Sequence, residues 1–129
     1  MTTEPLLLSD CSITLQPFTD GEAEFRVEAR GIDVKYGRIS AVFLLVLAEA
    51  RLSGDGWVEC RELGAGTGVG ERAVDVYLAR LRQLFLRFGF ENAHMLVEGR
   101  PRYRRLTIDP SRIRIAPAVE PPDPRPAGA

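Results

Sequence analysis

Apolar and polar residues alternate along the first third of the chain, and this alternation predicts β-strands. Residues 12–15 alternate loosely, and residues 24–29 place apolar side chains on one face and charged side chains on the other. After a turn at Arg30 and Gly31, residues 32–36 alternate again. Period-two alternation that is interrupted by a glycine turn is typical of a β-hairpin. We therefore expect short antiparallel strands before the first helix.

The apolar run 41–48 predicts a helix that lies deep in the core. Ser40 can serve as its N-cap, and the glycines of 53–56 end it near Leu52. The run is far shorter than the roughly 20 residues that a membrane-spanning helix needs. The N-terminus has no basic segment before its short leucine run, so it does not resemble a secretion signal. We therefore expect a cytoplasmic protein without a membrane partner.

A short helix, a glycine-rich turn and a longer helix form the most informative pattern of the sequence. We expect the short helix over 59–65, the turn over 66–70 and the long helix over 71–88. In the long helix, apolar residues recur at helical spacing and form one stripe. The stripe consists of Val74, Leu78, Leu81, Phe85 and Phe88. This order of elements is that of a helix-turn-helix unit.

A helix-turn-helix unit needs small and apolar residues where its helices meet. Gly64 or Ala65 is small enough to let the second helix approach, and Gly68 can adopt the left-handed conformation of the turn. Val69 and the first residues of the apolar stripe can then hold the two helices together. Gly89 is placed to end the long helix.

Two further strands, at 95–97 and 103–108, are predicted on either side of a turn at 98–102. They form a hairpin with four arginines at or just beyond its tip. A basic hairpin directly after a helix-turn-helix unit makes the winged version of that unit. We therefore expect an α+β winged helix-turn-helix fold with N-terminal antiparallel strands, three helices and a C-terminal hairpin as the wing, residues 97–106.

The length and charge of the chain fit one small nucleic-acid-binding domain. We place this domain at 1–115 and expect the proline-rich segment 116–129 to be disordered. The net charge of the chain is −1, but residues 72–105 hold eight arginines and three acidic residues. That segment therefore carries +5, and the rest of the chain carries −6. A charge polarised in this way suits a phosphate-facing surface on an acidic body.

The long helix resembles the recognition helix of a known family. Residues 72–82 read Arg-Ala-Val-Asp-Val-Tyr-Leu-Ala-Arg-Leu-Arg, which is similar to R-T-V-D-V-H-I-S-R-L-R in the winged-helix DNA-binding domains of bacterial response regulators (OmpR/PhoB type). Residues 97–99, Val-Glu-Gly, and 103–104, Tyr-Arg, are similar to the wing pattern V-R-G-x-G-Y. The resemblance covers about 24–108 and implies a divergent, standalone member. The positions that it implies to face DNA are Arg72, Tyr77, Arg80 and Arg82.

The chain departs from this family at several places. Glu98 stands where the wing has Arg, and the turn 99–102 reads Gly-Arg-Pro-Arg. The segment before the long helix is shorter than in the family, so we do not expect its loop for contacting RNA polymerase. No receiver domain precedes the module in this sequence, so the resemblance leaves control by phosphorylation and activation of transcription open.

We expect the long helix to enter the major groove of double-stranded DNA and the hairpin to contact the adjacent backbone. The helix face opposite the apolar stripe suits a groove, because small residues lie there between arginines. The predicted DNA-binding residues are Arg72, Val76, Tyr77, Arg80, Arg82, Gln83, Arg87, Arg100, Arg102 and Arg104. The protein would be a small bacterial transcriptional regulator or a DNA-binding accessory factor, as a monomer or a homodimer, and its DNA binding would be sequence-specific or directed at the backbone. In the alternative, the same face docks on a protein such as RNA polymerase or another regulator, or is simply solvated.

Catalysis is not expected from this sequence. The glycines of 64–70 lack the Gly-Lys-Ser/Thr ending of a phosphate-binding P-loop. His94 is the only histidine and has no partner at metal-ligand spacing, and no nucleophile with a base and an orienting acid stands out. Cys11 and Cys60 are expected to be free thiols. We therefore predict no catalytic residue, no metal site and no cofactor.

Overall fold

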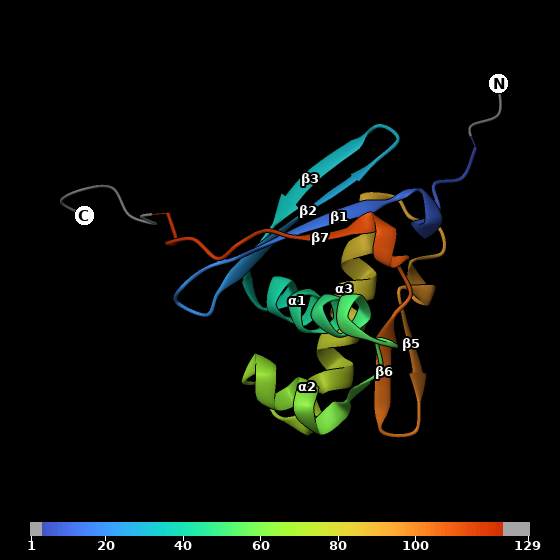
Figure 1. Ribbon diagram of the computed structural model, residues 1–129. Coiled ribbons are helices and arrows are strands. Elements are labelled where there is room, and N and C mark those ends of the chain that lie inside the picture. Colours follow the sequence, from blue (N-terminus) through green and yellow to red (C-terminus); the bar gives the residue numbers. More distant parts are fainter. Residues whose placement is uncertain (1–3, 123–129) are drawn as a thin grey trace.

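The computed structural model describes residues 4–122, which form an α+β fold with three helices and two sheets (Figure 1). The first sheet has four strands in the order β3-β2-β1-β7. The strands span Ser12–Pro17 (β1), Ala23–Ala29 (β2), Ile32–Tyr36 (β3) and Ile113–Ile115 (β7). β1, β2 and β3 are antiparallel neighbours, and β7 runs parallel to β1. The predicted α+β class and the three N-terminal strands are confirmed.

Side chains of β2 alternate between the core and the solvent, as the sequence pattern predicts. Phe25 and Val27 are buried, whereas Arg26 and Glu28 point outward. The fourth strand, β7, is absent from the sequence-based prediction. Its three residues are too few to show a clear period, and it pairs with β1 about one hundred residues earlier in the chain.

The chain continues alongside β1 after β7 ends. The amide of Ala116 donates a hydrogen bond of 2.9 Å to the carbonyl of Leu15, and the amide of Val119 donates one of 3.3 Å to that of Pro17. The sequence predicts disorder from Ala116 onward, and the structure differs from this prediction over the first residues of the segment. Non-proline residues there keep amides that can pair with β1 between the prolines. Residues 123–129 of the predicted tail lie outside the described residues.

The three helices lie on one side of the four-stranded sheet (Figure 1). They span Arg38–Ser53 (α1), Cys60–Thr67 (α2) and Val74–Phe88 (α3), and a 3-10 turn at Glu71–Ala73 leads into α3. All three predicted helices are present. However, α1 begins two residues before Ser40, so that Gly37 rather than Ser40 is its N-cap, without a side-chain hydrogen bond. Gly89 adopts a φ of 110° and ends α3 as predicted.

The second sheet has three antiparallel strands in the order β4-β6-β5. They span Val58–Glu59 (β4), Val97–Arg100 (β5) and Tyr103–Leu106 (β6). The predicted hairpin is therefore present, but its first strand is shifted from 95–97 to 97–100, and its second strand ends two residues earlier than expected. The chain before β5 forms a 3-10 turn at Ala93–Met95 instead of extending the strand.

One hydrophobic core joins the two sheets and the helices. Phe85 of α3 stacks on Phe25 of β2, with ring centroids 6.1 Å apart, and also contacts Phe90 at 5.8 Å. Leu44 and Leu47 of α1 are fully buried in the same core. Because α3 is fixed at its centre by the apolar stripe, its opposite face is held outward rather than left to rotate.

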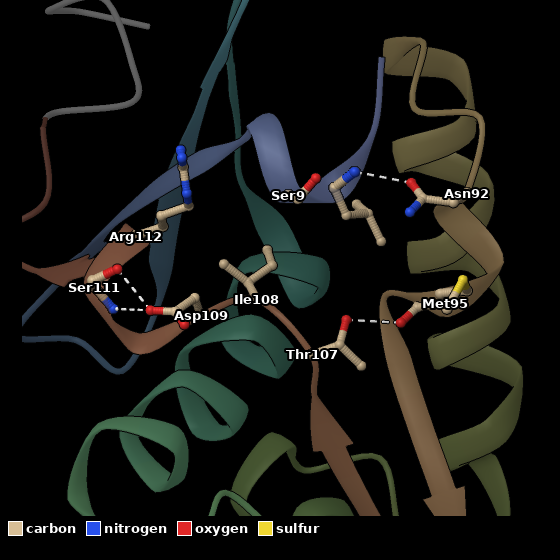
Figure 2. Close-up of a pocket in the computed structure, with 9 residues that line it drawn as sticks. Ser9, Asn92, Met95, Thr107, Ile108, Asp109, Ser111 and Arg112 are labelled. Atoms are coloured by element: carbon tan, nitrogen blue, oxygen red, sulfur yellow. Dashed lines mark hydrogen bonds between the residues drawn. The ribbon is translucent and has the colours of Figure 1, made fainter. Parts of the chain in front are cut away.

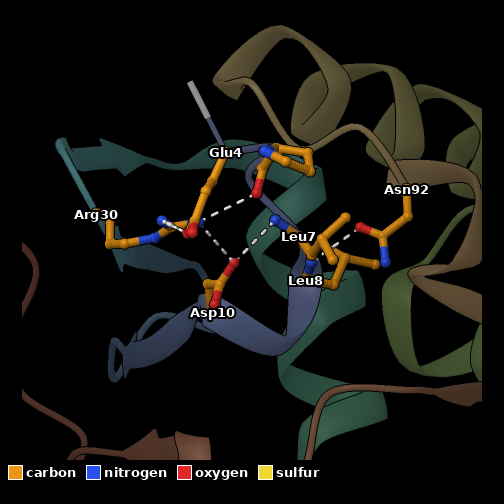
Figure 3. A network of polar contacts seen from close by, with 7 residues as sticks. Glu4, Leu7, Leu8, Asp10, Arg30 and Asn92 are labelled. Carbon is orange, nitrogen blue, oxygen red and sulfur yellow. Dashed lines mark hydrogen bonds and ion pairs between the residues drawn. The ribbon is translucent and has the colours of Figure 1, made fainter. Parts of the chain in front are cut away.

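A polar network fastens the N-terminal segment to both halves of the fold (Figure 3). Arg30, at the β2–β3 turn, donates hydrogen bonds to Glu4 at 2.9 Å and Asp10 at 3.2 Å. The amide of Leu8 donates to Oδ1 of Asn92, which follows α3, at 2.9 Å. The network thus ties the first residues to the four-stranded sheet and to the C-terminal end of α3.

Candidate nucleic-acid interface

One face of α3, together with the turn before it, points to the solvent and is called the outer face below. It carries most of the side chains that the helical period places opposite the apolar stripe. The apolar residues of the stripe are buried, with Phe88 half-buried at the end of the helix. The exposed residues that make up the outer face are Arg72, Val76, Ala79, Arg80, Gln83, Leu86 and Arg87. This surface combines long basic side chains with one small residue near its middle.

A glycine contact fixes the position of α3 relative to α2. A Cβ atom on Gly64 would lie 2.5 Å from the carbonyl carbon of Gly70 and 2.6 Å from the amide nitrogen of Glu71. Only glycine therefore allows the chain to pass this close to α2. Gly68 ends α2 with a φ of 78°, as predicted. Val69 packs against the core, so the turn is held by apolar contact as well.

Tyr77 does not share the outer face of α3. Its ring is partly buried and stacks on Phe43 of α1, with centroids 5.5 Å apart and planes 17° apart. The guanidinium of Arg80 lies 5.0 Å above the same ring. Tyr77 thus fills the space between α3 and α1 and holds Arg80 in place.

Arg82 points inward from the flank of α3. Its Nη2 donates a hydrogen bond of 2.9 Å to the carbonyl of Val97, and its Nε is buried without a partner among the described residues. The side chain therefore fastens α3 to the start of β5. Sequence reasoning assigned Arg82 to DNA, but its contacts in the structure are internal.

Arg104 is also bound within the fold. Its Nε and Nη2 donate to the two carboxylate oxygens of Asp75, at 3.1 and 3.2 Å, and its side chain is only 19% exposed. The hydrogen bonds from Arg104 to Asp75 raise the pKa of the guanidinium further above its ordinary value. Asp75 thus neutralises one of the arginines that the sequence places in the DNA contact, and it joins α3 to β6.

The tip of the β5–β6 hairpin presents Arg100 and Arg102. The Arg100 guanidinium lies 4.3 Å from the ring centroid of Trp57 and 4.9 Å from that of Tyr103. Arg102 is exposed in the turn and has a φ of 70°, a left-handed conformation that is uncommon outside glycine. Arg105, by contrast, is paired with Glu98, and its guanidinium also lies over the Trp57 ring, 4.6 Å from the centroid.

Five of the predicted DNA-binding arginines remain exposed without an ion pair to any carboxylate in residues 4–122. These five, called the free arginines below, are Arg72, Arg80, Arg87, Arg100 and Arg102. Three belong to α3 or the turn before it, and two belong to the hairpin tip. The arrangement can bind polyanions, since the fold itself leaves these charges uncompensated.

Comparisons with known protein families, curated proteins and solved structures gave no match.

Sequence reasoning missed Arg38, the first residue of α1. Its φ is 69°, and it lies beside Arg80 and Arg87 in a hollow between α1 and α3. The sequence places Arg38 between a predicted strand and a predicted helix, where no periodicity assigns it to a surface. Its isolated positive charge just before an apolar helix was the only available signal.

Another hollow, of about 490 Å³, lies where the segment before β1 meets the segment between β6 and β7 (Figure 2). Its polar groups are largely bonded to the protein. Thr107 Oγ1 donates to the carbonyl of Met95 at 2.7 Å, and Asp109 Oδ1 accepts from the amide and hydroxyl of Ser111 at 2.9 and 2.6 Å. These hydrogen bonds hold segments of the protein together and leave few polar groups for a ligand. The basic surface of α3 and the hairpin tip is therefore the stronger candidate site.

Other kinds of site find no support in the part of the chain that the structure describes. Residues 4–122 contain no group of three metal-ligating side chains, and His94 is exposed. Cys11 and Cys60 are free, and burial raises the pKa of the Cys11 thiol to about 11. None of the described helices has the length and apolar character that crossing a bilayer demands.

Proposed function

We propose that this protein is a winged helix-turn-helix module that binds double-stranded DNA. In this proposal α3 enters the major groove, and the β5–β6 hairpin acts as a wing on the adjacent backbone. The observation that carries the proposal is the gathering of the free arginines on α3 and the hairpin tip. They lie exposed and unpaired within residues 4–122, whereas Arg26 and Arg30 are paired with carboxylates. Arg112 and Arg114 are also exposed without an ion pair in these residues, but they lie next to and within β7, away from α3 and the hairpin tip.

The order and pairing of elements support the winged arrangement. The chain runs α1, β4, α2, α3, β5, β6, and the short strand β4 pairs with β6 beside the hairpin. The major groove of B-DNA is about 12 Å wide and admits an α-helix. Ala79 lies near the middle of the outer face, so the helix axis can approach the base edges while longer side chains reach to either side.

The side chains of the outer face are suited to two kinds of DNA contact. Arg72 and Arg87 can bind phosphates or the N7 and O6 acceptors of guanine, and Gln83 can form a paired contact with adenine. Val76 is 51% exposed and offers an apolar surface for a thymine methyl group. No bond is made or broken in this function, which depends on position and charge.

The internal contacts of Arg82 and Arg104 support the proposal indirectly. They join α3 to β5 and β6, so that the helix and the hairpin tip keep one relative orientation. A helix and a wing that bind a rigid duplex together gain affinity when they are preorganised. We therefore assign these two predicted residues a positioning role and place the direct contacts on the free arginines.

Selection of genomic DNA fragments by the purified protein tests the proposal. We expect enrichment of a defined set of fragments. The symmetry of the DNA site that they share will distinguish binding by a monomer from binding by a homodimer. Loss of enrichment in Arg72→Gln, with retention in Arg114→Gln on β7, would connect the selection to the outer face. No enrichment over input DNA contradicts sequence-specific binding, and no mobility shift at low salt contradicts DNA binding altogether.

A protein-docking role for the same face is the second candidate. Val76 and Leu86 are 51% and 50% exposed on the outer face, and apolar side chains of this size suit a protein partner such as RNA polymerase or another regulator. Capture of one partner that persists after nuclease treatment, and that is lost in Leu86→Ser, supports docking. The same variant should bind duplex DNA normally if DNA is the ligand.

A further inference from the structure

A hollow of about 250 Å³ lies between the beginning of α1 and the outer face of α3. Three arginines are among the residues that line it, Arg38 of α1 and Arg80 and Arg87 of α3. Three hydroxyl-bearing side chains also line it, namely Tyr36, Ser40 and Tyr77. The hollow therefore offers many hydrogen-bond donors and a local charge of +3.

No carboxylate that the structure describes neutralises the positive charge of this hollow. Within residues 4–122, none of its three arginines lies within ion-pair distance of a carboxylate. Glu24 lies beside Gly37, but it is paired with Lys35 at 3.1 Å. Like charges repel when they converge, so an arrangement of this kind favours an anionic ligand that joins them.

The local backbone is consistent with a role for Arg38 in binding rather than in folding. Arg38 has a φ of 69°, a conformation that is unfavourable for any residue with a Cβ atom. The first turn of α1 contains no acidic side chain, and its N-cap makes no side-chain hydrogen bond. Glycine would adopt this conformation more easily, yet arginine occupies the position and lines the hollow.

We propose that the hollow between α1 and α3 binds one phosphate group. This inference rests on the proposed function for the source of the phosphate, a phosphodiester of the duplex. Asp75 and Arg82 mark the flank of α3 that contacts the hairpin, and Tyr77 and Arg80 mark the flank that contacts α1. The hairpin and the hollow thus bind backbone on opposite sides of the helix. The phosphate in the hollow belongs to the DNA strand that lies beside α1.

Two measurements on the full chain test this site. In the first, inorganic phosphate replaces chloride at constant ionic strength while backbone amide signals are recorded by NMR. The amides of residues 38–40 should shift saturably, and Arg38→Gly or Arg87→Gln should abolish the saturable shift. Arg114→Gln, which removes one arginine from β7, should leave the shift unchanged.

The second measurement is the salt dependence of binding to a duplex of about 20 base pairs. The slope of log affinity against log salt concentration is negative, and each lost phosphate contact makes it shallower by about 0.9. Arg38→Gly should show this decrease and bind about tenfold more weakly at low salt, while its melting temperature stays equal or rises because the backbone strain is relieved.

The two measurements separate the site from the proposed function. A saturable shift together with the decreased slope assigns the phosphate to the duplex. A saturable shift with an unchanged slope, or with no duplex binding by the wild-type chain, assigns it to a free phosphate and removes the link to DNA. The absence of a saturable shift in the wild-type chain overturns the site, whether or not the protein binds DNA.

Discussion

Asp75 of α3 and Arg104 of β6 are joined by two hydrogen bonds, of 3.1 and 3.2 Å, across 29 positions of sequence. The pair connects the two elements that are proposed to contact DNA. It also removes one positive charge from the surface, since the carboxylate is bound to an arginine that would otherwise be free. The pair therefore holds α3 and the β5–β6 hairpin in one relative orientation, but it lowers the net positive charge of the surface that they form.

Replacing Asp75 by Asn should strengthen binding to duplex DNA. The amide still accepts a hydrogen bond from Arg104, but the surface loses one negative charge and gains a guanidinium without an ionic partner. We expect affinity at low salt to rise a few-fold and the log–log salt slope to steepen by up to about 0.9. Stability should change by less than about 1 kcal/mol, because Asp75 is 70% exposed. Fluorescence anisotropy with a labelled duplex measures both quantities. Weaker binding at unchanged stability would indicate that the full ion pair is needed to orient the hairpin.

Replacing Gly64 by Ala should destabilise the protein. The new Cβ would lie 2.5 Å from backbone atoms of Gly70, and neither segment can move aside without shifting α2 or α3. Overpacking of this kind costs about 1–3 kcal/mol. Urea unfolding followed by circular dichroism provides the measurement.

Gly66→Ala is the matched control in the same helix. A Cβ there would meet only Val46 Cγ2 at 3.5 Å, an ordinary contact, so the better helix propensity of alanine should stabilise by up to about 1 kcal/mol. Equal effects of the two substitutions on stability would show that the close approach of α2 to the turn is not the reason why position 64 needs glycine.

Replacing Arg102 by Gly should weaken DNA binding without unfolding the hairpin. The left-handed φ of 70° suits glycine, so stability should change by less than about 1 kcal/mol. The salt slope should become shallower by about 0.9 for one lost phosphate contact. Arg102→Lys should retain the slope, because it keeps the charge. If both variants bind as the wild type does, the hairpin tip does not reach the backbone.

Acid should weaken the attachment of the N-terminal segment. The amide of Leu7, and then Arg30, hold the pKa of Asp10 below its usual range. A carboxyl group whose pKa is lower in the folded state stabilises the fold above its unfolded pKa, near 4, and this contribution is lost as the pH falls through the folded value. The melting temperature of the wild type should therefore exceed that of Asp10→Asn at pH 6, and the difference should shrink toward pH 3. A constant difference over this range would contradict the role of the charge.

Much of the fold follows from local sequence patterns. The alternation around Phe25 and Val27, the apolar run of α1 and the helical stripe of α3 each correspond to an observed element. Glycine positions were equally informative, because Gly64 and Gly68 meet requirements that few other residues can meet. The short strand β7 could not be predicted, since its partner lies far away in the chain.

The candidate site was predictable in its location but not in the state of each arginine. Helical periodicity separates outward from inward positions, yet Arg82 and Arg104 bond to groups that lie 15 and 29 residues away. Such partners depend on tertiary structure. For the same reason, the sequence did not predict that Tyr77 packs against α1 or that Arg38 lies beside Arg80 and Arg87.

The most direct test of the proposed DNA-binding surface compares two charge-matched double variants by the salt dependence of duplex binding. Arg72→Gln with Arg100→Gln removes free arginines from α3's leading turn and the hairpin tip, whereas Arg112→Gln with Arg114→Gln removes the same charge next to and within β7. The proposal predicts a slope shallower by about 1.8 for the first pair, for two lost phosphate contacts, and a nearly unchanged slope for the second. Equal slopes for the two pairs, or a wild-type affinity that does not vary with salt, would contradict it.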